Sequence, residues 1–493
     1  MLGLALANKL AGPSGSGSGY FPSWKVLPGN LPPGMVYSGA SLRTQVNADG
    51  SLGYGPHNLL PGARDFASAS WLKVNATATT DSVAGPDGSL SAGVITATAS
   101  GAAYVYRGTS GAVNMASAVQ VKVKKGTADY CVLNLSSNID RNCWFNLNTG
   151  AFETVHASCT TTVTTQSGGF YLITVSVTNT PTSPFLVVGP ATGNGSMTAA
   201  AGATVVVCDG QVNAGAAQPY YPTTSAPYFG LRTQDYSADP TKPGILIEPQ
   251  ATNLFLNSET PATQNITVTA QAYTLSCYGT GSIVLSGTGS GTLNGPGSAT
   301  GRTSLTFTPT AGTLTLTVSG TAKVQLESGS VASSYIPTAA SQVTRAADVL
   351  YWPIASIPGF GTSGTLVMEV IIPDKTGADG SYLLSPNTTD GLLYRGSGYW
   401  KTYDGTNGLQ TPASGPPTAQ FNTGVNKVAV SWGGGVRTLC ANGNPARSSA
   451  GAAPSGSQLN VLAAFGAISG GSLYSLRYYP QALPDATMQA LTA

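Results

Sequence analysis

Apolar and polar residues alternate with a period of two along several parts of the chain. The alternation is regular over residues 118–124, 171–178, 303–309 and 312–319. It predicts half-buried strands, because successive side chains of a strand point to opposite faces. Turn-forming groups such as Pro-Asp-Gly at residues 86–88 separate the segments. Many short strands with glycine-rich turns predict an all-β fold of β-sandwiches and exclude a helical bundle.

Two phrases occur twice in the sequence. The opening phrase contains Leu-Arg-Thr-Gln and runs on to Asn-Leu-Leu or Asn-Leu-Phe, at residues 38–60 and 228–255. The closing phrase starts with Gln-Val-Asn or Gln-Leu-Glu and ends in Tyr-x-Pro-Thr, at residues 211–223 and 325–338. Repeated phrases around variable interiors predict tandem modules. Modules in series suit binding at a surface better than a single catalytic cleft.

A chain of 493 residues is long enough for about three domains. The predicted segments are an extended N-terminal anchor with a Gly/Ser linker (1–34), a connector (35–57), a jelly-roll module 1 (58–224), a second connector (225–252), a shortened β-sandwich module 2 (253–340) and a last β-sandwich (341–493). Module 2 keeps both phrases but contains no tryptophan, and we expect it to act as a spacer.

Charged residues make up only 9% of the chain, hydrophobic residues 41%, and the net charge is +2. This combination favours a folded chain, since disorder requires low hydrophobicity with high net charge. The small net charge argues against a nucleic-acid partner. No run of about 20 apolar residues is present, so we expect no membrane insertion.

The six cysteines contain no Cys-x-x-Cys pair, and the histidines are His57 and His156 alone, which argues against a zinc site. Scattered reduced cysteines are favoured, although pairing among Cys131, Cys143 and Cys159 stays open.

Catalytic chemistry has few candidates in this sequence. No two acidic residues recur at a spacing that suggests a glycosidase pair, and no Gly-x-Ser-x-Gly surrounds a serine. Asp379, Asp390 and Asp404 each precede a glycine, and Asp374 lies near them. Such aspartates form turns more often than calcium sites. We therefore expect no enzyme activity, no cofactor and no metal, and whether the last segment binds calcium stays open.

The densest aromatic stretch of the chain lies within the last segment. Aromatic rings stack on the apolar side of a sugar ring, and neighbouring polar groups supply hydrogen bonds. Half of the side chains of a strand must face inward, so we expect some of these rings in the core. The candidate carbohydrate-binding residues are Tyr394, Arg395, Tyr399, Trp400, Tyr403 and Asp404.

Several segments resemble those of bacteriophage proteins. Residues 58–71, from Asn-Leu-Leu through Phe66 to Trp71, resemble the openings of carbohydrate-binding-like jelly rolls in phage fibres. Residues 244–259 and 334–348 resemble phrases that recur in phage tail and fibre proteins. Residues 471–491 resemble the terminal strand and closing helix of concanavalin A-like, laminin G-like domains.

The resemblance implies a non-enzymatic bacteriophage tail fibre or virion appendage. Its concanavalin A-like domain would attach to host surface polysaccharide. It implies a homotrimer on the virion, joined to a tail or capsid protein through residues 1–34. A capsid-decorating head fibre or cement protein is one alternative, and a polysaccharide depolymerase tailspike is another. Host, glycan and subunit number stay open.

Overall fold

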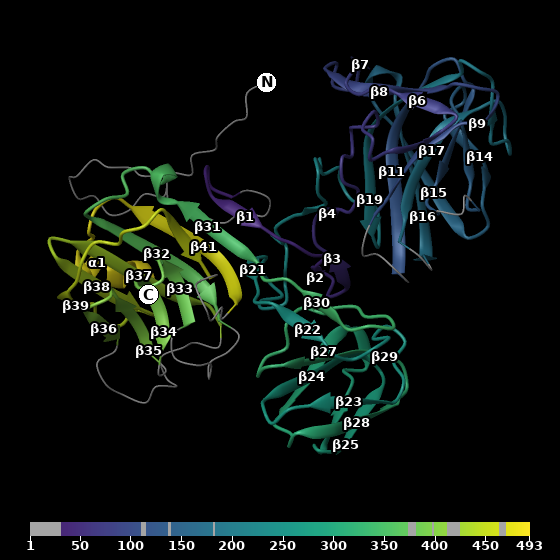
Figure 1. Cartoon of the computed structure of the whole chain (residues 1–493). Helices are drawn as coiled ribbons and strands as arrows, with labels where there is room; N and C mark the ends of the chain where they lie inside the picture. Colours follow the sequence, from purple (N-terminus) through teal and green to yellow (C-terminus); the bar gives the residue numbers. More distant parts are fainter. Residues whose placement is uncertain are drawn as a thin grey trace.

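The structure is a computed structural model that describes residues 31–109, 115–136, 140–180, 183–372, 381–396, 399–411, 424–462 and 470–493. These residues form antiparallel β-sheets and a single α-helix, which confirms the predicted all-β sandwich class. Most of the predicted N-terminal anchor, residues 1–30, lies outside the described part. Figure 1 shows the sandwiches grouped around a common centre.

Module 1 contains two packed sheets. The first contains, in spatial order, β14 (Ala151–Val155), β13 (Cys143–Asn146), β12 (Tyr130–Asn134), β17 (Phe185–Ala191), β10 (Tyr104–Gly108) and β5 (Leu72–Val74). The second contains β15 (Cys159–Thr165), β16 (Tyr171–Thr180), β11 (Met115–Lys125), β19 (Thr204–Ala214), β8 (Leu90–Ala97) and β6 (Ala76–Ala78), and β7 (Val83–Ala84) also pairs with β8. β9 (Gly101–Ala102) pairs separately with β18 (Thr198–Ala199). Leu60, Trp71 and Phe145 belong to the core between the sheets, whereas Trp144 is half-buried.

Module 2 is the smaller sandwich. One sheet contains β23 (Gln264–Val268), β28 (Gly312–Ser319), β25 (Ser282–Gly287) and β26 (Gly291–Asn294). The other contains β27 (Ser298–Phe307), β24 (Tyr273–Gly279) and β29 (Ala322–Ser328). Phe255, Leu275 and Leu314 lie fully buried in its core.

The third sandwich has the largest apolar core. Its first sheet contains β1 (Val36–Ser38), β31 (Val349–Pro353), β40 (Gln458–Val461), β33 (Ser381–Ser385), β34 (Gly391–Gly396), β35 (Tyr399–Tyr403) and β36 (Gly408–Thr411). Its second contains β21 (Ile245–Ile247), β41 (Gly471–Tyr479), β32 (Gly364–Ile371), β37 (Asn426–Gly433), β38 (Val436–Ala441) and β39 (Arg447–Ala450). The closing helix α1 (Asp485–Thr492) buries Met488 against Val367 and Ala429 of the second sheet.

This third sandwich is discontinuous in sequence, and we call it the central sandwich: residues 349–493 together with β1 and β21. β1 comes from the first connector and pairs with β31, while β21 comes from the second connector and pairs with β41. Met35, Ile245 and Ile247 are buried in the same core as the rest of the sandwich. Both connectors therefore supply an edge strand, one to each sheet.

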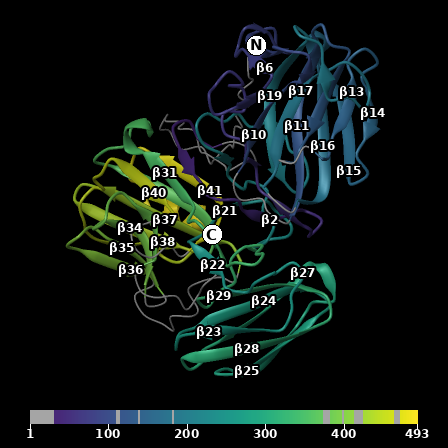
Figure 2. The ribbon, with the colours of Figure 1, turned by 45° about the vertical axis from the view of Figure 1, so that its right-hand side comes forward.

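The two modules leave the central sandwich through short antiparallel strand pairs, which we call necks. The first neck joins β4 (His57–Asn58) to β20 (Tyr228–Phe229). The second joins β22 (Ala251–Asn253) to β30 (Val343–Arg345). A hairpin of β2 (Thr44–Val46) and β3 (Leu52–Tyr54) lies between the bodies, as Figures 1 and 2 show. Each module is thus an insertion whose two ends lie side by side.

Candidate functional site

The predicted aromatic stretch forms a hairpin of β34 and β35 in the first sheet of the central sandwich. Tyr394 pairs with Lys401 and Arg395 pairs with Trp400, so each pair points to one face of the sheet. Along β35 the burial alternates, with Trp400 buried between the half-buried Tyr399 and Lys401. Since successive side chains alternate, Tyr399, Lys401 and Tyr403 share the outer face with Tyr394.

A further tyrosine completes this outer face. Tyr382 of β33 pairs with Tyr394, and their ring centroids are 5.6 Å apart. We call Tyr382, Tyr394, Tyr399 and Tyr403 the tyrosine face. All four residues are half-buried.

The structure removes two of the predicted residues from this surface. Trp400 is only 1% exposed and belongs to the core of the central sandwich, and Arg395 is 2% exposed. Their side chains are directed inward because they occupy the alternate positions of β34 and β35. Trp400 and Arg395 were therefore wrong as candidate carbohydrate-binding residues, whereas Tyr394, Tyr399 and Tyr403 lie on the outer face.

Asp404 ends β35 and holds a turn. Its carboxylate accepts hydrogen bonds from the backbone amides of Asn407 (2.6 Å), Ala452 (2.7 Å) and Thr406 (2.9 Å). Partial burial raises the pKa of Asp404, but the bonds from Asn407 and Ala452 outweigh it and lower the pKa well below its usual value. The side chain has few acceptor positions left for a ligand.

The other aspartates considered for calcium are engaged or undescribed. Asp390 forms two hydrogen bonds with the guanidinium of Arg437, at 2.8 and 2.6 Å. Asp374 and Asp379 lie outside the described residues. Within the part of the chain that the structure describes, no three His, Cys, Asp or Glu side chains gather around a possible metal position. The six cysteines are free and buried.

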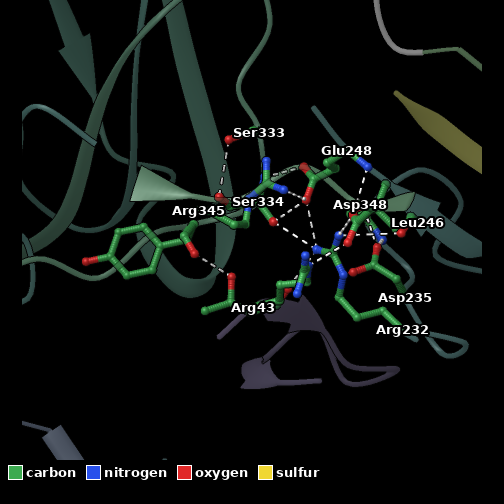
Figure 3. A network of polar contacts seen from close by, with 12 residues as sticks. Arg43, Arg232, Asp235, Leu246, Glu248, Ser333, Ser334, Arg345 and Asp348 are labelled. Carbon is green, nitrogen blue, oxygen red and sulfur yellow. Dashed lines mark hydrogen bonds and ion pairs between the residues drawn. The ribbon is translucent and has the colours of Figure 1, made fainter. Parts of the chain in front are cut away.

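The most concentrated buried charge lies where the connectors meet. Arg43 of the first Leu-Arg-Thr-Gln phrase contacts Asp348 (Nε to Oδ1, 2.5 Å). Arg232, the same residue of the second phrase, binds Asp348 and Glu248, both at 2.8 Å. Arg345, from the second neck, lies 3.6 Å from Glu248. Figure 3 shows the three guanidinium groups directed at these two carboxylates.

Burial of this network costs hydration free energy, which the attraction between its charges must offset. The side chains of Arg232 and Asp348 are 0% exposed. Burial raises the pKa of Glu248, but the charges of Arg345 and Arg232 outweigh it and hold the pKa well below its usual value. The Glu248 backbone amide also donates to the Asp348 carboxylate, and the Asp348 amide donates to the Glu248 backbone carbonyl, both at 2.9 Å. The network therefore joins both connectors to the start of the last segment.

A second repeated arrangement closes the base of each module. In module 1, Asn58 accepts hydrogen bonds from the amides of Leu60 (3.0 Å) and Val212 (3.2 Å) and donates to the carbonyls of Gly210 (3.3 Å) and Tyr221 (2.8 Å). In module 2, Asn253 accepts from Phe255 and Leu326 (both 3.1 Å) and donates to Val324 (3.2 Å) and Ile336 (2.8 Å). Each asparagine hydrogen-bonds the opening phrase to the closing phrase of its module. The same arrangement therefore occurs in both modules, and we call Asn58 and Asn253 with their four hydrogen bonds each the asparagine locks.

Sequence reasoning identified the repeated phrases but not the meeting of their arginines. The available signal was an arginine at the same place in both phrases of a chain with only 9% charged residues. Comparison with models of known protein families finds no match, and comparison with curated proteins finds none. No helix among the described residues is long and apolar enough to cross a membrane.

Proposed function

We propose that this protein is a non-enzymatic structural component of a bacteriophage virion, a tail fibre or appendage that attaches to host surface glycans through the tyrosine face. The observation that carries the proposal is the set of half-buried tyrosines on three adjacent strands, β33, β34 and β35. Tyrosine offers a rigid apolar ring with a polar hydroxyl, which suits stacking on a sugar. Lys401 on the same face adds a hydrogen-bond donor.

The architecture supports a role in display. The buried arginine network and two edge strands join the connectors to the central sandwich, so the tyrosine face stands on a rigid body. The resemblances to phage fibre jelly rolls and concanavalin A-like domains support the virion assignment. In this proposal three copies assemble, and residues 1–34 attach them to a tail or capsid protein.

The test is adsorption of the purified protein to host cells and to a glycan array. Replacing Tyr399 and Tyr403 together by serine removes two rings without touching the core. We expect adsorption to fall about tenfold or more. Tyr106→Ser, a half-buried tyrosine of module 1, is the matched control and should keep full adsorption. Equal adsorption of both variants would place host recognition elsewhere.

Two measurements separate this proposal from its alternatives. Electron microscopy of virions labelled for this protein distinguishes a tail appendage from a capsid-decorating head fibre or cement protein. Incubation with host polysaccharide tests the depolymerase alternative, since release of reducing ends would show glycosidase activity.

A further inference from the structure

A cleft of about 530 Å³ lies where the connectors, module 2 and the central sandwich meet. The β2–β3 hairpin and residues 235–240 form one wall, and β27 and residues 331–335 form another. Ser472 at the start of β41 lines its base. The volume falls within the range of roughly 300–1,000 Å³ of small-molecule sites.

Three of the residues that line the cleft each have a buried polar atom without a hydrogen-bond partner among the described residues. The atoms are Oε1 of Gln45, Nε of Arg302 and Oγ of Ser472. Ser472 is 2% exposed, so its hydroxyl has little access to bulk solvent. Buried polar groups in folded proteins nearly always have partners. A bound molecule can supply the missing bonds to these atoms, which are an acceptor, a donor and a hydroxyl.

The aromatic part of the lining comes from tyrosines. Tyr278 is 4% and Tyr335 1% exposed, and the guanidinium of Arg302 lies 5.4 Å from the Tyr278 ring centroid. Arg302 also donates to the Ser333 carbonyl (2.5 Å) and to Oγ of Ser276 (2.7 Å). The cation is thus held in place by protein groups along one wall.

The acidic groups of the lining are already engaged. Asp235 accepts hydrogen bonds from the amides of Ser237 (2.8 Å) and Val46 (3.3 Å). Glu248 binds Arg232 at 2.8 Å and accepts a hydrogen bond from the Ser334 amide at 2.6 Å, and Figure 3 shows this part of the network. The lining also contains one basic residue, Arg302, so it offers no cluster of like charges for an ion. Hydroxyl groups fit both the donor and the acceptor that stay unpaired.

We propose that this cleft binds a neutral sugar unit, a site separate from the tyrosine face and independent of the function proposed above. The ring of the sugar packs on the apolar part of the lining. Its hydroxyls bond to Ser472, Gln45 and Arg302.

Saturation-transfer NMR with the full chain tests the proposal, using glucose, galactose, mannose and N-acetylglucosamine at millimolar concentration as probes. We expect at least one to receive saturation. Ser472→Ala removes one ligand bond and should weaken that binding about three- to tenfold. Because the Ser472 hydroxyl has no protein partner, the variant should melt no earlier than the parent.

Ser475→Ala is the matched control. Its hydroxyl is also buried and unpartnered on β41, but it does not line the cleft. This variant should bind the sugar as the parent does. A second variant, Ala332→Trp, fills the cleft from its half-buried rim and should abolish binding.

Three results would overturn the proposal. One is the absence of saturation for all four sugars, which would mean that only water meets the polar atoms. Another is tighter binding of glucuronate than of glucose, which would show an anion site. The third is binding lost in the Tyr399 and Tyr403 variant but kept in Ser472→Ala, which would place the sugar on the tyrosine face.

Discussion

Arg43 and Arg232 occupy the same place in the two Leu-Arg-Thr-Gln phrases, and each contacts a different oxygen of Asp348, at 2.5 and 2.8 Å. One carboxylate therefore joins the two connectors, although the arginines are far apart in sequence. The arginines of the repeated phrase thus hold together the two connectors, from which the chain enters each module. Its duplication reflects two insertions into one sandwich.

Such a network costs free energy to bury and is stabilising only when complete. Charges removed from water lose several kcal/mol of hydration each, which their mutual attraction must offset. Well-packed apolar residues in place of a whole buried ion network are often equally stabilising, so we infer that this network specifies the geometry of the junction. Loss of one partner is a different matter, because it leaves a buried charge uncompensated.

Arg232→Met should destabilise the central sandwich by about 3–5 kcal/mol. The change leaves Glu248 and Asp348 buried with less positive charge. Hydrogen-exchange mass spectrometry would show faster exchange in β21 and β41. Lys323→Met removes the cation of an exposed pair with Glu259, and as a control it should cost less than about 1 kcal/mol. Equal effects of the two substitutions would refute a structural role for the buried network.

His57 should make module 1 sensitive to acid. The ring is 1% exposed, its Nδ1 lies 2.8 Å from the Gly55 carbonyl, and its Nε2 accepts the Ala214 amide at 2.8 Å. Burial lowers the pKa of His57 from 6.5 to about 4. Between these values the unfolded chain binds the proton and the folded chain does not, so stability is complete above pH 6.5 and decreases toward pH 4. The full loss is about 3 kcal/mol.

NMR of the histidine rings measures this directly, because the chain contains only two histidines. The His57 signals should stay in the neutral, Nδ1-protonated form until the pH approaches 4. His156, which is exposed, provides an internal reference in the same spectrum. Protonation of His57 near pH 6.5 without unfolding would contradict the expected shift.

The asparagine locks should act on one module each. Asn253→Ala leaves the buried amides of Phe255 and Leu326 without an acceptor, which should destabilise module 2 by about 2–4 kcal/mol. Hydrogen exchange should speed up in β24 and β29 and stay unchanged in β11. Asn58→Ala is the reciprocal control and should affect module 1 alone. Parallel changes in both modules would show that the locks are coupled.

The second neck indicates that module 2 can be deleted without unfolding the central sandwich. Asn253 and Val343 are paired across the second neck, so an Asn-Gly turn can replace residues 254–342. The shortened chain should stay soluble and keep the fold of the central sandwich. Deletion of residues 349–493 should instead cause aggregation, because Met35, Ile245 and Ile247 lose their core. Size-exclusion chromatography distinguishes the outcomes, and a soluble product of the second deletion would refute the discontinuous sandwich.

Local pattern was enough to predict several elements. The alternation over residues 118–124 and 312–319 corresponds to β11 and β28, and the closing helix implied by the resemblance of residues 471–491 is α1, Asp485–Thr492. For Trp400 the local sequence pattern was not sufficient to predict which face of the sheet the side chain occupies. Some of the four aromatic residues had to face inward, but which ones depends on the pairing of β34 with β35. That pairing depends on neighbouring strands rather than on the hairpin's own sequence.

The sequence by itself determined the all-β class and the repeated phrases, because both depend on residues close together along the chain. Only the tertiary structure decided where the connectors belong. β1 and β21 are three residues long, too short to show a period, and each becomes a strand only against an edge formed by later residues. The Tyr37 hydroxyl binds Asp348 across 311 residues. Contacts over such separations form when the whole core is assembled, so no local pattern records them.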